Sequence, residues 1–99
     1  MDVRGFRATA GGGSAPEASA PLRALWHEAQ GDWKRAHEIV QDEDDRDSAW
    51  VHAYLHRKEG DLANAGYWYR RARKPIAKET LEQEWEAIVA ALLAARASA

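Results

Sequence analysis

The sequence predicts an all-α fold, on three observations. Apolar residues recur at helical spacing in every stretch after Pro21. No stretch has the alternating pattern of a half-buried strand. Two Gly-Asp pairs, Gly31-Asp32 and Gly60-Asp61, each separate two helical stretches. Glycine adopts the left-handed conformation that ends a helix, and aspartate accepts hydrogen bonds from the first N–H groups of the next one. We therefore expect two antiparallel helical hairpins and a C-terminal capping helix.

The first 20 residues predict no regular structure. They contain Gly11–Gly13 among alanines, and only Val3 and Phe6 are large and apolar. Glycine loses the most conformational entropy on ordering, and this segment has little apolar surface to offset that loss. The sequence therefore predicts a disordered Gly/Ala-rich tail over residues 1–20 and a single α-helical domain over residues 21–97.

The first hairpin begins at Pro21, because proline favours the first position of a helix. The apolar face of its first helix consists of Leu22, Leu25, Trp26 and Ala29. After the turn, the second helix carries a similar stripe of Trp33, Ala36, Ile39 and Val40. Both stripes have the i, i+3, i+4 and i+7 spacing, or close to it, that lets one helix face pack against a neighbour.

The acidic run 42–47 predicts a loop before the second hairpin, because its five acids repel one another. We expect Asp47 or Ser48 to cap a third helix from Trp50 to Glu59. A fourth helix then reaches about Arg73. Its inner side is predicted to consist of Leu62, Ala65, Trp68, Tyr69 and Ala72.

The last helix starts at a predicted capping box, in which the side chains of Thr80 and Gln83 each bond the other's backbone N–H. One row of apolar residues follows it, and Val89 and Leu93 lie beside that row. Roughly 80 ordered residues make a small core. We therefore consider a homodimer that buries Val89 and Leu93.

The second hairpin resembles a tetratricopeptide repeat. Trp50 stands early in its first helix, Gly60 at the turn, and Ala65, Tyr69 and Ala72 along its second helix, in the order of that motif. The two Gly-Asp turns are 29 positions apart, against roughly 34 in the family. This resemblance extends over about residues 22–75 and implies a protein–protein interaction or adaptor module.

The segments 50–61 and 67–72 also resemble a small family of uncharacterised microbial proteins. That resemblance implies no activity.

In repeat hairpins of this kind, the first helix of each pair lines a concave face that receives a short peptide or a partner helix. The sequence therefore predicts that an unknown protein or peptide binds this face. The candidate residues on it are His27, His52, His56, Arg57 and Glu59.

His52, His56 and Glu59 also support an alternative, a metal site. They share one helix face, and two histidines one turn apart can both bind a metal ion. A third ligand would come from His27 or His37 if the helices bring it near. Alanine follows His52, so the HExxH signature is absent, and the chain lacks the cysteines that structural zinc sites commonly use. We therefore predict no cofactor and keep metal binding as the alternative.

A basic cluster supports a further alternative, binding of nucleic acid or another polyanion. It consists of Arg70, Arg71, Arg73 and Lys74, next to aromatic residues on which bases could stack. The net charge of −2 gives no whole-chain argument for nucleic acid. We expect instead a solvated face, or one paired with the acidic run 42–47 and the acidic start of the last helix.

The composition excludes several classes of function. The 99 residues include no cysteine, no Gly-x-Ser-x-Gly motif and no phosphate-binding glycine loop, so we predict no enzyme. No segment is apolar enough to suggest a membrane helix. The absence of a hydrophobic leader and of cysteine predicts a cytoplasmic protein.

Overall fold

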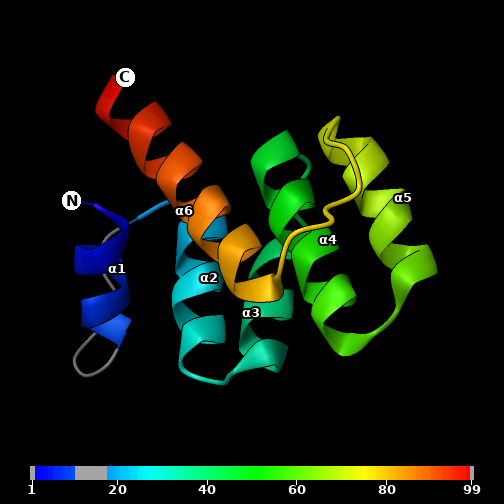
Figure 1. Ribbon diagram of the computed structural model, residues 1–99, viewed down its shortest axis with the longest axis horizontal. Helices are drawn as coiled ribbons and strands as arrows, with labels where there is room; N and C mark the ends of the chain where they lie inside the picture. Colours follow the sequence, from blue (N-terminus) through cyan, green and yellow to red (C-terminus); the bar gives the residue numbers. More distant parts are fainter. Residues whose placement is uncertain (1, 11–17, 99) are drawn as a thin grey trace.

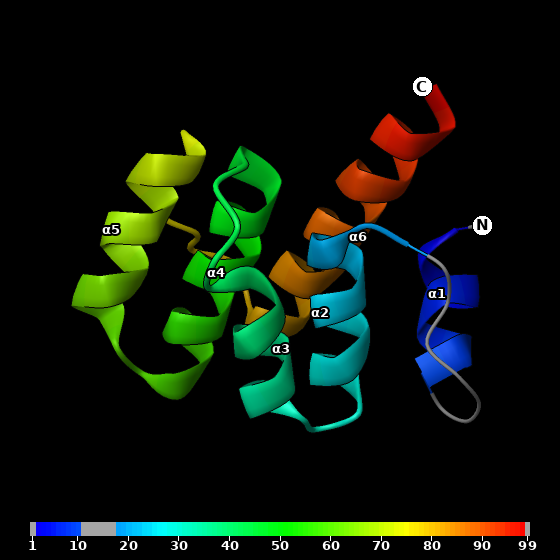
Figure 2. The ribbon, with the colours of Figure 1, turned by 180° about the vertical axis from the view of Figure 1, so that it is seen from behind.

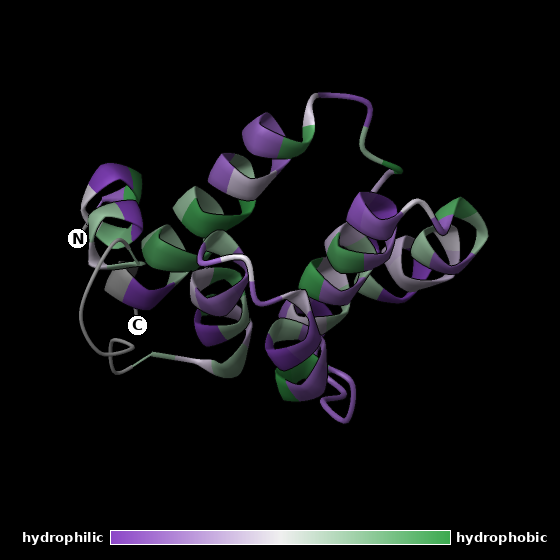
Figure 3. Ribbon diagram, turned by 90° about the horizontal axis from the view of Figure 1, so that it is seen from below, coloured by the Kyte–Doolittle hydropathy of each residue, from purple (hydrophilic) through white to green (hydrophobic). Residues whose placement is uncertain are grey.

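The computed structural model describes residues 2–10 and 18–98, and over these residues it contains helices and no strand. This confirms the all-α class. The elements in chain order are α1 (Val3–Ala10), α2 (Ala20–Ala29), α3 (Trp33–Val40), α4 (Arg46–Glu59), α5 (Leu62–Ala72) and α6 (Leu81–Ser98) (Figure 1). Polar and apolar residues alternate around these helices, as amphipathic packing requires (Figure 3).

Two short turns fold α2 against α3 and α4 against α5 (Figure 2). Gly31 and Gly60 have φ of +86° and +91°, the left-handed conformation in which other residues are strained. The Asp32 carboxylate then accepts a hydrogen bond from the N–H of Arg35 at 3.1 Å, and that of Asp61 from Asn64 at 3.2 Å. This confirms the prediction that each glycine ends one helix and each aspartate caps the next.

The predicted disordered tail is wrong for residues 3–10, which form α1. The Asp2 carboxylate accepts a hydrogen bond from the N–H of Gly5 at 2.8 Å and caps this helix. Phe6 is 1% exposed and lies 6.0 Å from the Trp85 ring, centroid to centroid. Burial of Phe6, the hydrogen bond from the Trp26 indole to the Thr9 hydroxyl at 3.0 Å and the ion pair of Arg7 with Glu86 at 3.3 Å all oppose the entropy lost on ordering this helix. The predicted tail residues 11–17 lie outside the described residues.

α4 begins at Arg46, four residues before the predicted start at Trp50. Asp45 is its cap, not Asp47 or Ser48, and its carboxylate accepts a hydrogen bond from the N–H of Ser48 at 2.9 Å. Asp47 falls in the first turn, where its charge interacts favourably with the helix dipole. The acidic run is therefore partly helical.

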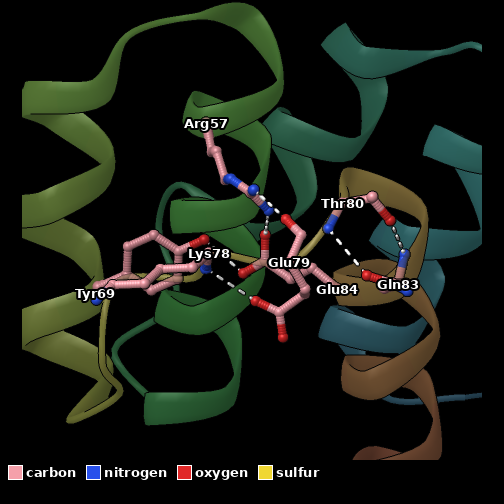
Figure 4. A network of polar contacts seen from close by, with 7 residues as sticks. All are labelled: Arg57, Tyr69, Lys78, Glu79, Thr80, Gln83 and Glu84. Atoms are coloured by element: carbon pink, nitrogen blue, oxygen red, sulfur yellow. Dashed lines mark hydrogen bonds and ion pairs between the residues drawn. The ribbon is translucent and has the colours of Figure 1, made fainter.

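α6 lies across α2 and α4 and completes the core (Figure 1). The Trp85 indole N–H donates a hydrogen bond to the carbonyl of Leu25 on α2 at 3.2 Å. The predicted capping box is confirmed by two hydrogen bonds of 3.1 Å between Thr80 and Gln83 (Figure 4). Val89 is fully buried within the chain, so it is not available for the predicted homodimer contact, and Leu93 is partly buried against the core.

Candidate functional site

The face predicted to bind a partner is covered by α6. Arg57 on α4 donates a hydrogen bond to the Glu84 carboxylate of α6 at 2.9 Å (Figure 4). The Tyr69 hydroxyl donates to the other oxygen of the same carboxylate. Burial, followed by the hydrogen bond to Glu84, raises the pKa of Tyr69, so this hydroxyl remains a donor at neutral pH. Arg57 therefore joins two helices of this chain, and its side chain is only 17% exposed.

The histidines predicted for the same face point elsewhere. His52 and His56 are 3% and 6% exposed, so the prediction that they are accessible is wrong. His27 is half-buried and lies against its neighbour Trp26 on α2. Glu59, the acid of the predicted set, is exposed, and its carboxylate lies 2.7 Å from Nδ1 of His56. The predicted set therefore does not form one accessible surface.

His37, His52 and His56 instead converge between α3 and α4. One ring nitrogen from each lies within 4.8 Å of the others. The Nε2 atoms of His37 and His52 are 3.0 Å apart. Of the two histidines considered as a third ligand, the structure therefore brings His37, and not His27, to the pair on α4.

Two tryptophans enclose this histidine cluster (His37, His52 and His56). The Trp68 ring stacks on His52 with centroids 3.9 Å apart, and the Trp33 ring stacks on His37 with centroids 5.0 Å apart. Both tryptophans are half-buried. The cluster is therefore flanked by aromatic rings from α3 and α5.

Two rings of the histidine cluster have lowered pKa values. Burial, followed by the nearby His37 and His56, lowers the pKa of His52 to about 3. Burial also lowers the pKa of His37, followed by the effect of His56. His37 and His52 are therefore neutral at pH 7, so each ring has one N–H and one nitrogen with a lone pair.

A second candidate surface lies on α5 and the segment after it. The large apolar side chains that are exposed in the described part of the chain are Leu62, Tyr67 and Ile76, at 69%, 44% and 60%. The predicted inner position of Leu62 is wrong, because this first residue of α5 lies next to the turn and outside the helix contact. Leu62 and Ile76 line a hollow of about 630 Å³, together with Arg57, Ala65, Tyr69, Ala77 and Lys78.

The predicted basic cluster borders this surface. Arg70, Arg71, Arg73 and Lys74 are all exposed. The Arg71 guanidinium lies 5.4 Å from the Trp68 ring centroid, and the Lys74 ammonium lies 4.2 Å from that of Trp50. Within residues 2–10 and 18–98, no carboxylate forms an ion pair with these four cations. The expected pairing with the acidic run or with α6 is therefore absent from the described structure.

The chain matches no protein-family model, no curated protein and no solved structure. Among the described residues, no helix is both long and apolar enough to cross a membrane. Function is therefore inferred from the histidine cluster and from the surface on α5.

Proposed function

We propose that this protein is a small tetratricopeptide-like interaction module that binds an acidic segment of a partner protein. The binding surface is the α5 surface, defined as Leu62, Arg70, Ile76 and Lys78 with the hollow between them. One observation carries the proposal, namely that Leu62 and Ile76 are both exposed at this hollow of about 630 Å³. Exposed apolar residues that are rimmed by charge are typical of protein-binding sites.

The cations around the hollow indicate the charge of the partner. Lys78 lines the hollow, and the Arg70 guanidinium reaches over Gly66 toward Ile76. A Cβ at Gly66 would lie 3.6 Å from Nη1 of Arg70 and 4.0 Å from Cδ1 of Ile76. A partner with carboxylates beside one or two apolar side chains would match both properties. Such charge complementarity accelerates association and disfavours basic competitors.

A second hollow, which is lined by Trp50, Lys74 and Glu79 among others, adjoins the first. It has a volume of about 500 Å³ and shares Ile76, Ala77 and Lys78 with the first one. Residues 76–78 line both hollows, so the two adjoin each other there. A short extended segment or a single helix could lie along them, and peptides bind grooves in both of these ways.

The packing of both hairpins supports the tetratricopeptide-like part of the proposal. Ala36 and Ala65 occupy equivalent positions after the two Gly-Asp turns, and both are buried. Small residues there let paired helices approach closely. Tyr69 and Ala72 are buried as well, at the positions of the aromatic and the second alanine of the motif. α6 packs on α2 and α4, the first helices of the two hairpins, so the proposal assigns the partner to the outer side of α5.

A peptide-display selection tests this function and identifies the partner segment at the same time. The library consists of peptide segments encoded by the genome that encodes this protein. Segments are selected on the wild type alone, and the affinity of the enriched segments is then measured for the wild type and for Ile76→Glu. The proposal predicts enriched segments that combine acidic and apolar residues. Their affinity should fall at least about tenfold with Ile76→Glu and less than about twofold with Lys34→Glu, an exposed charge change on α3.

Two results would contradict the proposal. One is a set of enriched segments with no excess of acidic residues. The other is equal binding of the enriched segments to wild type and Ile76→Glu. Salt-sensitive retention of a single-stranded oligonucleotide, with no peptide enriched, would instead favour polyanion binding through Arg70, Arg71, Arg73 and Lys74.

A further inference from the structure

The histidine cluster has the spacing of a metal site. Imidazole nitrogens bound to one tetrahedral Zn²⁺ at 2.0–2.1 Å lie about 3.3 Å from one another. The Nε2 atoms of His37 and His52 are already 3.0 Å apart. The widest separation in the cluster, at most 4.8 Å, needs to shorten by no more than about 1.5 Å. A small rotation of one side chain provides such a movement.

The hydrogen bonds of the cluster are incomplete. Nε2 of His52 faces another imidazole, so at most one proton can lie between the two nitrogens. Nδ1 of His52 is buried and has no hydrogen-bond partner in the described structure. A cation bound to Nε2 of both rings would replace the one proton that the two nitrogens share, and Nδ1 of His52 would then carry the proton of its ring.

Glu59 orients one ring of the cluster. Its carboxylate accepts a hydrogen bond from Nδ1 of His56 at 2.7 Å. The proton is then on Nδ1, which leaves the Nε2 lone pair of His56 as the ligand atom. Metal-binding histidines very often donate their other N–H to a carboxylate in this way, which fixes the tautomer and raises the basicity of the ligand. The carboxylate also offsets part of the charge of a divalent ion.

The surroundings of the cluster are also those of a metal site. Trp33 and Trp68 stack on two of the three rings. Neutral imidazole prefers Zn²⁺, Ni²⁺ and Cu²⁺ over Mg²⁺ and Ca²⁺, which require oxygen ligands.

We propose that His37, His52 and His56 bind one divalent transition-metal ion, with Zn²⁺ as the probe that tests it. Glu59 acts as a positioning residue for His56. The three protein ligands leave a fourth position for water or for a group of another molecule. The ion would join α3 to α4 across the acidic loop between them, so binding should stabilise the folded chain.

Isothermal titration of the metal-free full-length chain with Zn²⁺ alone tests the proposal. We expect one ion per chain and no heat with Mg²⁺. At a Zn²⁺ concentration of about a hundred times Kd, the melting temperature should rise by about 10 °C or more. Replacement of Zn²⁺ by Co²⁺ should produce the visible absorption of a four-coordinate ion.

The matched variants are His37→Gln and His27→Gln. His37→Gln removes a ligand from the surface of α3 and should abolish binding. His27→Gln alters the histidine that lies outside the cluster and should leave Kd unchanged. Glu59→Gln should weaken binding about 10- to 100-fold. Equal Kd values for the two histidine variants would overturn the proposal, and so would a folded wild type that shows no heat with Zn²⁺.

If His37→Gln fails to fold, NMR of the histidine ring signals of the wild type tests the metal site instead. Zn²⁺ should shift the ring signals of His37, His52 and His56 and leave those of His27 in place. Shifts confined to His27, or no shift in any ring, would refute the site. Ile76→Glu should still bind Zn²⁺ with the affinity of the wild type, so the metal site and the α5 surface can fail independently.

Discussion

Phe6→Ala should destabilise the protein by about 3 kcal/mol, because Phe6 anchors α1 to the rest of the chain. Its side chain is 1% exposed and belongs to a core cluster that includes Trp26, Trp85 and Val89. Burial of a phenylalanine side chain contributes about 1.5–3 kcal/mol, and a pair with another aromatic ring adds about 0.5–1.5 kcal/mol. Measured losses for Phe→Ala in protein cores, about 3–5 kcal/mol, include the cavity that remains. α1 has only eight residues and can detach locally, so we expect the lower end of that range.

Urea unfolding of the full-length chain, followed by tryptophan fluorescence and circular dichroism, measures this loss. Arg4→Ala is the matched control, because Arg4 is on the same helix and is exposed. It should change the free energy of unfolding by less than about 0.5 kcal/mol. If Phe6→Ala also changes it by less than about 0.5 kcal/mol, α1 does not pack on the core and the ordered N-terminal helix is wrong.

Three further predictions concern α5 and the tyrosines. Gly66→Ala should stabilise the protein by about 0.5–1 kcal/mol in urea unfolding, because alanine favours a helix and its Cβ would make ordinary van der Waals contacts. A lower free energy of unfolding would instead show that the added Cβ clashes. Tyr69→Phe should destabilise the protein by about 1–3 kcal/mol, because the buried Glu84 carboxylate loses a hydrogen-bond donor. Tyr67→Phe, at an exposed position, should cost less than about 0.5 kcal/mol. Equal losses for the two variants would contradict the hydrogen bond to Glu84. The free energy of unfolding should fall as pH rises above about 10. Burial raises the pKa of Tyr54 and Tyr69 in the folded chain, so these hydroxyls ionise first in the unfolded chain. Equal urea midpoints at pH 8 and pH 11 would refute this prediction.

Local signals allowed much of the fold to be predicted. A helix end depends on a few neighbouring residues, so Gly31-Asp32, Gly60-Asp61 and the Thr80–Gln83 box could be recognised from the sequence alone. The start of α4 could not, because the four aspartates within residues 42–47 are all acceptable caps and local chemistry does not choose among them. Only the structure shows that Asp45 has the extended conformation of a cap.

Long-range contacts account for the errors. Phe6 becomes part of the core only because α6 brings Trp85 to it, and the two residues are far apart in the sequence. The same helix covers Arg57, so the side of α4 predicted to bind a partner is occupied. His37 and His52 belong to different hairpins, and their approach depends on how α3 packs against α4. Periodicity identifies the apolar face of a helix but not the neighbour that will cover it.

Chemical-shift mapping on the ¹⁵N-labelled full-length chain tests the proposed function most directly. The ligand is a display-selected acidic segment, added at low salt because screening weakens contacts between exposed charges. Binding on the α5 surface predicts amide shifts concentrated at Leu62, Gly66, Arg70 and residues 76–78, all of which disappear in Ile76→Glu. Shifts centred on α2 around His27, with those α5 amides unchanged, would contradict it.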